Sequence, residues 1–237
     1  MVVEWTRRVL NYPRMKMLID QKETLIMTYS DDYVTVVDDV CDPNVIQAIK
    51  VQYNNNLNAF YADDKDWGNS KLQKHPGLRG RQIIAGKHKE ADYPSGHIID
   101  KLIHAVLEQI DFEWGWVRVD ERLYTPGSEM SWHCDGAHLA GAATLYLNDY
   151  WHTDWGGEFI YAKKNLEVHS QWQPFMLETD DYANEVAINN ELGCVYPKFN
   201  RLVITNGDVM HKINRIDERA KARYALRFHF HYETEMI

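Results

Sequence analysis

The sequence contains little cysteine, no long apolar stretch and no secretory leader pattern. Its three cysteines, Cys41, Cys134 and Cys194, are too few for a disulfide framework, and none are spaced as in a cysteine zinc site. No apolar run approaches the roughly 20 residues that a membrane-spanning helix requires. The amino terminus has charged residues among its apolar ones and no hydrophobic signal core. These absences predict a soluble, cytoplasmic protein with no membrane association.

The chain also lacks the positive charge that a nucleic-acid-binding surface needs. Its 35 Asp and Glu residues outnumber 26 Lys and Arg residues, which gives a formal net charge of −9. Affinity for nucleic acid comes largely from neutralising phosphates, so a nucleic-acid partner is disfavoured. The sequence has no internal repeat and no Gly/Ser-rich linker. We therefore expect residues 1–237 to form a single domain, large enough to bury a substantial core.

Residues 1–113 are expected to form a support of helices and a strand. Asp42 followed by Pro43 is a favourable start for a helix, because Asp caps a helix and Pro fits its first turn. The stretch SGHIIDKLIHAVLEQI has apolar residues at the spacing of an amphipathic helix. Between these segments, residues 61–81 are polar and contain several glycines. They are expected to form a long loop, a plausible lid over a bound substrate.

Residues 114–237 are expected to form a β-rich core, because short β-prone segments there alternate with turn residues. Helices followed by antiparallel strands predict an α+β fold with a barrel or sandwich body. The last segment, RYALRFHFHY, alternates strictly. Arg223, Arg227, His229 and His231 share one face, and large apolar residues share the other. We expect the apolar face to pack under the helices and the polar face to meet solvent or a polar cavity.

The stretch SEMSWHCDGAHLAG contains a histidine and an aspartate two residues apart. On an extended strand His133 and Asp135 project to the same side, about 6.6 Å apart along the chain at ~3.3 Å per residue. An imidazole and a carboxylate in this arrangement can occupy adjacent positions on one metal ion. The tripeptide fits two polar residues of an ordinary strand equally well. The pair alone leaves both interpretations open.

Residues further along the chain favour the metal. The strand-like RLVIT and the turn NGD lead to His211, a candidate third ligand. Two histidines and one carboxylate are the ligand set of non-haem Fe(II) oxygenases. Arg223 follows on the polar face of the last strand, and a buried arginine needs an anion, for which a carboxylate is a good bidentate partner. The order HxD, His, Arg therefore predicts a metal together with a carboxylate-bearing co-substrate.

The motifs LYTPGSEMSWHCDG, AATLYLND, GGEFIYA, YPKFNRLVITNGDVMHKI and RYALRFHF, in this order, resemble the Fe(II)- and 2-oxoglutarate-dependent dioxygenases, in particular the prolyl 4-hydroxylase-like branch. The resemblance runs from about Val117 to the carboxyl end. It implies a double-stranded β-helix, a jelly-roll barrel, with helices packed on the larger sheet, and it assigns the catalytic core to residues 114–237. The implied cofactors are Fe(II), 2-oxoglutarate and O2, with ascorbate as an optional reductant.

The resemblance also implies roles for individual residues. The residues implied to bind iron are His133, Asp135 and His211. The residues implied to hold or surround 2-oxoglutarate are Arg223, Tyr124, Thr144 and Tyr146, with Arg223 on the distal carboxylate.

Two features depart from the family pattern. Met130 stands three residues before the first histidine, where relatives often have an aromatic residue, usually Tyr. The interval from His211 to Arg223 is also longer than is typical, by about two residues. Arg219 and Lys221 share strand parity with Arg223 and are alternative ligands of the co-substrate carboxylate. Arg223 is preferred because it continues directly into the apolar strand.

The resulting hypothesis is an oxygenase that hydroxylates a C–H bond and releases succinate and CO2. The branch resemblance favours a peptidyl proline as substrate, with a free amino acid or another small molecule as the alternative. A second alternative is a non-catalytic β-barrel binding module. The sequence sets no oligomeric state.

Overall fold

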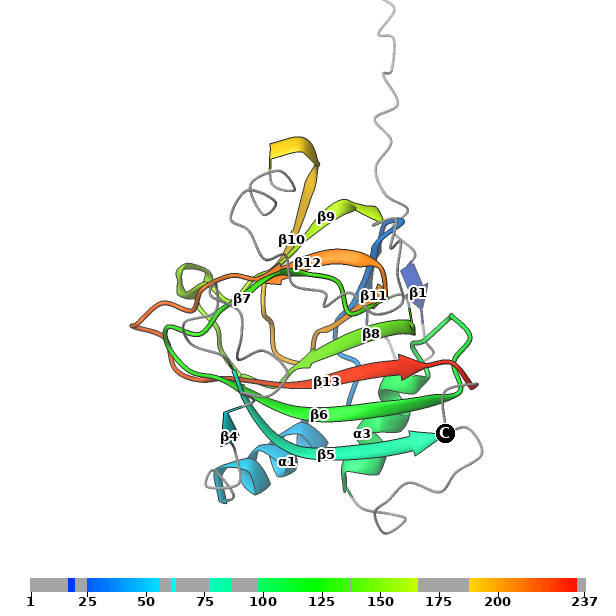
Figure 1. Cartoon of the computed structure of the whole chain (residues 1–237). Coiled ribbons are helices and arrows are strands. Elements are labelled where there is room, and N and C mark those ends of the chain that lie inside the picture. Colours follow the sequence, from blue (N-terminus) through cyan, green and yellow to red (C-terminus); the bar gives the residue numbers. More distant parts are fainter. Residues whose placement is uncertain are drawn as a thin grey trace, which may run out of the picture.

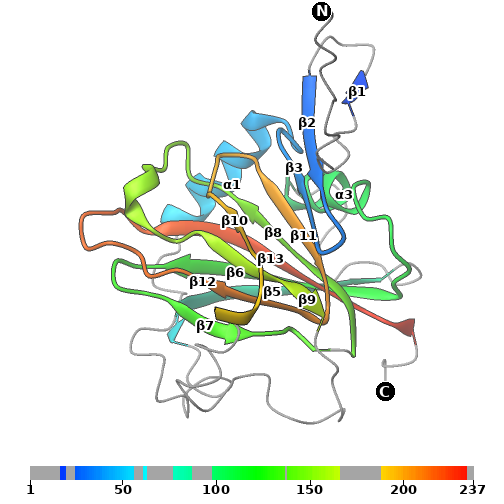
Figure 2. The same cartoon turned by 90° about the horizontal axis from the view of Figure 1, so that it is seen from above.

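The computed structural model describes residues 17–19, 25–55, 61–62, 77–86, 98–136, 138–165 and 188–233. Two antiparallel sheets face each other in this part of the chain (Figures 1 and 2). The larger sheet has the order β1 (Met17–Ile19), β2 (Leu25–Ser30), β3 (Val34–Val37), β11 (Leu202–Asn206), β8 (Leu139–Tyr146), β13 (Arg223–His231), β6 (Trp116–Tyr124), β5 (Leu78–Gly86) and β4 (Tyr61–Ala62). The smaller sheet has the order β10 (Leu192–Val195), β9 (Phe159–Asn165), β12 (Val209–Ile213) and β7 (Met130–His133).

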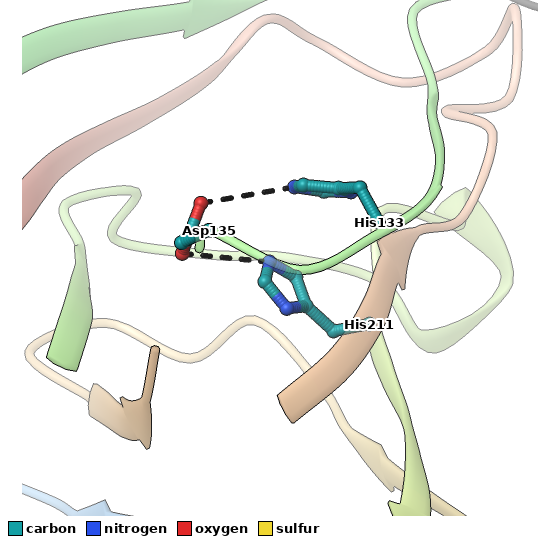
Figure 3. Close-up of side chains that lie close together, drawn as sticks. All are labelled: His133, Asp135 and His211. Carbon is teal, nitrogen blue, oxygen red and sulfur yellow. Dashed lines mark ion pairs between the residues drawn. The ribbon is translucent and has the colours of Figure 1, made fainter. Parts of the chain in front are cut away.

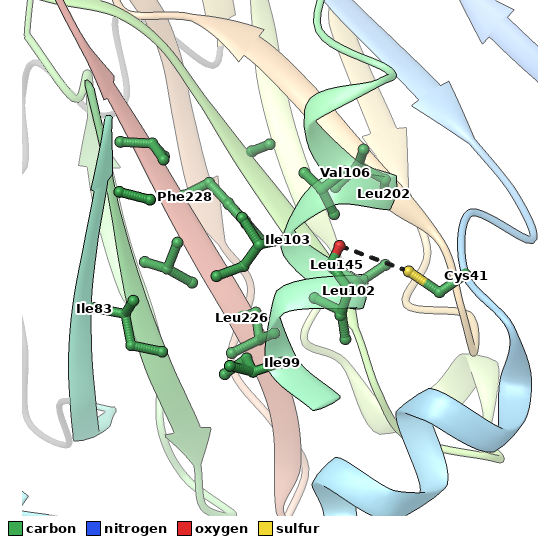
Figure 4. Packing of buried hydrophobic residues seen from close by; sticks show 14 of the residues in the cluster. Cys41, Ile83, Ile99, Leu102, Ile103, Val106, Leu145, Leu202, Leu226 and Phe228 are labelled. Carbon is green, nitrogen blue, oxygen red and sulfur yellow. Dashed lines mark hydrogen bonds between the residues drawn. The ribbon is translucent and has the colours of Figure 1, made fainter. Parts of the chain in front are cut away.

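Two helices, α1 (Pro43–Asn55) and α3 (Ile98–Leu107), cover the face of the larger sheet that points away from the smaller one (Figure 1). The apolar residues of α3, among them Leu102 and Ile103, pack against the outward side chains of β13, Leu226 and Phe228 (Figure 4). Leu102 and Leu226 are both fully buried. One apolar core therefore lies between the helices and the larger sheet. A second apolar cluster, which includes Phe159 and Val203, lies between the two sheets.

The start of α1 and the spacing of apolar residues in α3 agree with the sequence-based predictions. Asp42 precedes α1, and its side chain accepts a hydrogen bond from the backbone N–H of Asn44 at 2.9 Å. Pro43 is the first residue of the helix, which confirms the predicted start. The apolar positions of α3 are buried at the expected helical spacing. The strand expected within residues 1–113 is present as β3, in the sequence VTVV.

The long loop predicted over residues 61–81 is wrong at both of its ends. Tyr61 and Ala62 form β4, and the residues from Leu78 onwards belong to β5, which pairs with β6 along its length. The sequence of β5 does not alternate like a buried strand, because β5 lies next to the edge of the sheet and several of its side chains are exposed or half-buried. The remainder of the predicted loop lies outside the described residues, as does LEVHSQW, one of the short β-prone segments of residues 114–237.

The alternation of β13 separates the two faces as predicted. Leu226, Phe228 and Phe230 point to the helices and are fully buried. Arg223 and Arg227, on the other face, point between the two sheets and are also buried. The face of β13 that points into the barrel is therefore polar apart from Ala225, while its helix-covered face is apolar. None of the helices in the described ranges is both long and apolar enough to cross a membrane.

Asn200 links the segment just before α1 to the end of β8. Its side chain accepts a hydrogen bond from the backbone N–H of Cys41 at 2.9 Å and donates one to the Cys41 carbonyl at 2.6 Å. Its own N–H donates to the carbonyl of Tyr146, at the end of β8. The residue is fully buried and has a left-handed φ of 61°. Asparagine tolerates that conformation better than most residues.

We expect Asn200→Ala to lower the free energy of unfolding by about 2–3 kcal/mol, because two buried backbone groups lose their partners and alanine is strained at positive φ. Asn200→Gly removes the same two bonds without the strain, and should cost less. Urea titrations of the three proteins, followed by circular dichroism, measure the difference. Equal stability of wild type and Asn200→Ala would contradict this account.

Candidate metal centre

Two histidines face each other across neighbouring strands of the smaller sheet. His133 ends β7 and His211 lies in the middle of β12, and the two residues are direct partners in the antiparallel register. Their ring centroids lie 4.2 Å apart, and both side chains are buried. The sequence separates these residues widely. The pairing of β7 with β12 brings them together.

Asp135 lies just beyond the end of β7, and its side chain is 4% exposed. The next residue, Gly136, donates its N–H to the carbonyl of Gly207 at 2.9 Å, which is in the turn between β11 and β12. A Cβ at Gly207 would come within 2.4 Å of the Leu139 carbonyl oxygen, so only glycine permits this close approach. The turn that precedes His211 thereby fixes the segment that carries Asp135.

The three side chains converge (Figure 3). Asp135 Oδ1 lies 3.9 Å from His133 Nε2, and Asp135 Oδ2 lies 3.8 Å from His211 Nε2. One donor atom from each residue falls within 4.8 Å of the others. His211 Nδ1 donates to the Val209 carbonyl at 2.9 Å, which leaves its Nε2 lone pair directed at the site. The donor set fits Fe(II), for which two imidazoles and a carboxylate form the common facial triad.

Asp135 is held as an anion. Burial opposes its ionisation, but Arg227, His211 and His229 together outweigh burial, and the pKa of the Asp135 carboxyl lies well below its usual value. Arg227 reaches Asp135 Oδ1 directly from β13. His229, two residues further along, also faces Asp135 Oδ1, at 3.7 Å from its Nε2. A metal ligand with two buried donors beside it is oriented before any ion arrives.

Arg223 lies deeper in the same pocket, with 1% of its surface exposed. Its guanidinium carbon lies 4.4 Å from the ring centroid of Tyr124 and 5.4 Å from that of Tyr146. One of its nitrogens donates to the Gly157 carbonyl. Among the described residues no carboxylate pairs with Arg223, and neither its Nε nor the buried Tyr146 hydroxyl has a hydrogen-bond partner. An incoming carboxylate is the anion that this arrangement fits.

The other predicted pocket residues are placed as follows. Tyr124, Thr144 and Met130 line the pocket, and Tyr146 contacts it through Arg223. Met130 presents an apolar side chain to the pocket, and the rings of Tyr124 and Tyr146 lie beside the guanidinium of Arg223. Arg219 and Lys221, the alternatives to Arg223, are exposed, and Arg219 pairs with Asp217. Of the three basic residues, only Arg223 is among the described residues that line the pocket.

The polar face of β6 was not predicted from the sequence. Arg118, Asp120 and Arg122 alternate with Val117 and Val119. The valines belong to the helix-covered core, so the charged residues point between the sheets. The same period-two pattern that was read in the last strand is present in VRVDERLY and would have identified this face.

The charged face of β6 meets that of β13. Asp120 is fully buried, and its Oδ2 lies 3.5 Å from both Arg118 and Arg122 and 3.7 Å from His229 Nδ1. Arg118 donates to His229 Nδ1 at 2.8 Å, so the proton of His229 is on Nε2, towards Asp135. A network of charged and polar side chains therefore runs from Asp135 through His229 and Arg118 to Asp120.

The comparisons with known proteins agree with this geometry. Residues 121–231, from within β6 to the end of β13, match the 2OG-Fe(II) oxygenase superfamily. No curated protein matches the sequence of the chain.

Solved structures share its fold. A prolyl-4-hydroxylase from Pseudomonas putida superposes with a TM-score of 0.56 at 14% identity, covering 84% of this chain and 94% of that one. A prolyl hydroxylase from Trichoplax adhaerens, in complex with a peptide of the hypoxia inducible factor oxygen degradation domain, gives 0.55 at 14%, covering 86% of each. The α-ketoglutarate-dependent carbocyclase SnoK of nogalamycin biosynthesis gives 0.55 at 10%, covering 84% and 79%. The likeness confirms the expected double-stranded β-helix with helices on its larger sheet.

The buried histidines predict how stability depends on pH in the metal-free protein. Burial, and then the charge of Arg227, lower the pKa of His229 to about 3, and burial likewise lowers the pKa of His211. Below about pH 6.5 these histidines are therefore protonated in the unfolded chain but remain neutral in the folded chain. The free energy of unfolding should fall as the pH drops from 7 to 5, by up to about 1.4 kcal/mol per pH unit for His229 alone.

Urea titrations at pH 7, 6 and 5 measure this slope. His229→Gln, which cannot be protonated, should reduce it. A slope that is the same in the variant and the wild type would show that His229 is not the group responsible.

Proposed function

We propose that the chain is a 2OG-Fe(II) oxygenase, and that it hydroxylates a C–H bond of a peptidyl proline. The observation that carries the proposal is the convergence of His133, Asp135 and His211 beside a pocket whose lining includes Asp135, His211 and Arg223. In this proposal the first three residues bind Fe(II), and Arg223 binds the distal carboxylate of 2-oxoglutarate. Tyr124, Thr144 and Tyr146 surround the co-substrate.

Each side chain has a task that its contacts support. The bond from His211 Nδ1 to the Val209 carbonyl orients the imidazole towards the metal. Arg227 holds one oxygen of Asp135 and fixes the plane of the carboxylate. Tyr124 and Tyr146 enclose the guanidinium of Arg223 between aromatic rings, which favours a cation and keeps water out of its surroundings.

Fe(II), 2-oxoglutarate and O2 together supply the oxidising chemistry of the family, in which 2-oxoglutarate becomes succinate and CO2 and the substrate gains one oxygen atom. The residues of this chain would bind these groups, orient them and exclude water. Burial of all three metal-facing side chains suits that role, since water in the site would compete with substrate.

A peptide substrate is supported by the Trichoplax adhaerens relative, whose structure contains a bound peptide. A free amino acid or another small molecule remains the alternative, supported by the likeness to SnoK, an enzyme of nogalamycin biosynthesis. The third option, a non-catalytic binding module, is disfavoured because the family match includes the metal-facing cluster and Arg223.

The metal site is tested by removing its ligands singly. His133→Ala, Asp135→Ala and His211→Ala should each weaken Fe(II) binding by at least about tenfold, and each should abolish succinate release from 2-oxoglutarate. Anaerobic titration with Fe(II), with absorbance measured after addition of 2-oxoglutarate, reports binding separately from turnover. His152→Ala, which changes an exposed histidine of a surface turn, is the matched control. Unchanged metal affinity in the three variants would refute the assignment.

The co-substrate site is tested with a pair of arginine variants. Arg223→Gln should raise the Kd for 2-oxoglutarate at least about tenfold, because a buried carboxylate loses its charged partner. Arg219→Gln removes an arginine four residues earlier that is exposed and paired with Asp217, and should leave the Kd within about twofold. Calorimetric titration of the Mn(II)-loaded proteins measures both. A larger effect in Arg219→Gln would move the carboxylate site to that residue.

A further inference from the structure

Arg223 makes one hydrogen bond within the described ranges. Its Nη1 donates to the Gly157 carbonyl, and its Nε has no partner. Strand β13 fixes the backbone of Arg223, but the guanidinium lies at the end of a long side chain with several rotatable bonds. The strand alone therefore does not fix where the charge lies. That position depends on the Gly157 carbonyl and on the rings of Tyr124 and Tyr146.

Gly157 belongs to the turn that leads into β9. Gly156 and Gly157 both have left-handed φ angles, of 69° and 73°. A Cβ at Gly156 would come within 1.9 Å of the Arg215 carbonyl oxygen, so only glycine lets the turn approach the segment between β12 and β13 this closely. On the side of the pocket, a Cβ at Gly157 would lie 3.5 Å from Arg223 Cδ. The turn is therefore packed between that segment and Arg223.

One peptide group of this turn is bonded at both of its ends. Trp151 Nε1 donates to the Gly156 carbonyl at 2.8 Å, and the Gly157 N–H donates to the Asn214 carbonyl at 3.2 Å. The Gly156 carbonyl and the Gly157 N–H belong to the same planar peptide group. Two bonds on a planar group fix its orientation, and they restrict the direction of the next carbonyl, which is that of Gly157. Trp151 therefore acts on Arg223 through the backbone of Gly157.

The two ends of the pocket are thus fixed by different parts of the chain. His133, Asp135 and His211 define the metal end, on two strands of the smaller sheet and the segment after β7. The Gly156–Gly157 turn and Trp151 hold the guanidinium at the other end. A dicarboxylate that binds at both ends must match the separation between them, so a small displacement of the guanidinium changes which chain length fits.

We propose that Trp151 is a positioning residue for the co-substrate: it holds the Gly156–Gly157 turn, which sets the position of the Arg223 guanidinium and thereby the length of the 2-oxo dicarboxylate that binds. This inference rests on the proposed function, in which Arg223 binds the distal carboxylate. Because Gly157 engages Nη1, the carboxylate binds along the guanidinium edge that carries Nε and Nη2. Trp151 itself is not among the described residues that line the pocket.

The effect is measured by calorimetric titration of the Mn(II)-loaded full chain. Wild type should bind 2-oxoglutarate at least about tenfold more tightly than 2-oxoadipate, which is one methylene longer. Trp151→Phe removes the indole N–H and keeps an aromatic ring. It should raise the Kd for 2-oxoglutarate about fivefold and reduce the preference over 2-oxoadipate at least about threefold. The Kd for Mn(II) should stay within about twofold, because the metal end of the pocket is fixed separately.

Trp155→Phe is the matched control. Trp155 lies in the same turn, and its ring packs perpendicular to that of Trp151, with 5.5 Å between centroids. Within the described ranges it forms hydrogen bonds through its backbone and not through its indole. The control should leave both Kd values and the preference for 2-oxoglutarate within about twofold. An equal loss of preference in the two variants would reflect general loosening of the turn and would overturn the role of Trp151.

A crystal structure of the wild type with Mn(II) and 2-oxoglutarate tests the same geometry without a variant, so it decides even where Trp151→Phe does not fold. Arg223 should keep its hydrogen bond to Gly157 while the carboxylate lies against the Nε edge of the guanidinium. A guanidinium that has turned away from Gly157 to meet the carboxylate would overturn the proposal.

Failure of this inference is distinguishable from failure of the proposed function. No binding of 2-oxoglutarate to the Mn(II)-loaded wild type would refute the proposed function and this inference with it. Normal binding to the wild type, with the same Kd and the same preference in Trp151→Phe, would overturn the role of Trp151 and leave the proposed function standing.

Discussion

The antiparallel pairing of β7 with β12 is the constraint on which the candidate metal centre depends. It places His211 directly opposite His133, and it brings the turn at Gly207 against the backbone that carries Asp135. A shift of one residue in this register would turn one histidine to the opposite face of the sheet. The remaining strands of the smaller sheet hold this register, because β9 pairs with the other edge of β12 and Phe159 stacks on the ring of His211.

The charged interior follows from the same division of faces. Burying a charge is costly unless it is paired, and the barrel interior contains Arg223, Arg227 and Asp120 among its fully or nearly fully buried side chains. The apolar contacts on the other side of the larger sheet, between α3 and β13, stabilise the framework that keeps these charges in place. The stability of the helix-covered core thus permits a site that would be unfavourable on its own.

Local signals in the sequence were sufficient for several elements and for the candidate ligands. Asp42 and Pro43 mark a helix start through their own chemistry, and the alternation in β13 separates its two faces without any tertiary information. Contacts between residues far apart in the chain could not be predicted from the sequence. The bonds from Asn200 to Cys41 join positions 159 residues apart, and β5 is a strand because β6 pairs with it, not because its sequence is apolar. The polar face of β6 has the same alternation as β13, but the contacts of Asp120 with His229 depend on the pairing of these two strands.

The charge of the pocket is opposite to the charge of the chain. With a formal net charge of −9, the molecule as a whole repels anions, and salt screens that repulsion beyond about 10 Å. Arg223, for which the described residues provide no carboxylate partner, acts within that distance, where a direct guanidinium contact is much stronger than the distant surface charge. An anion is therefore selected by the pocket itself and not by long-range attraction.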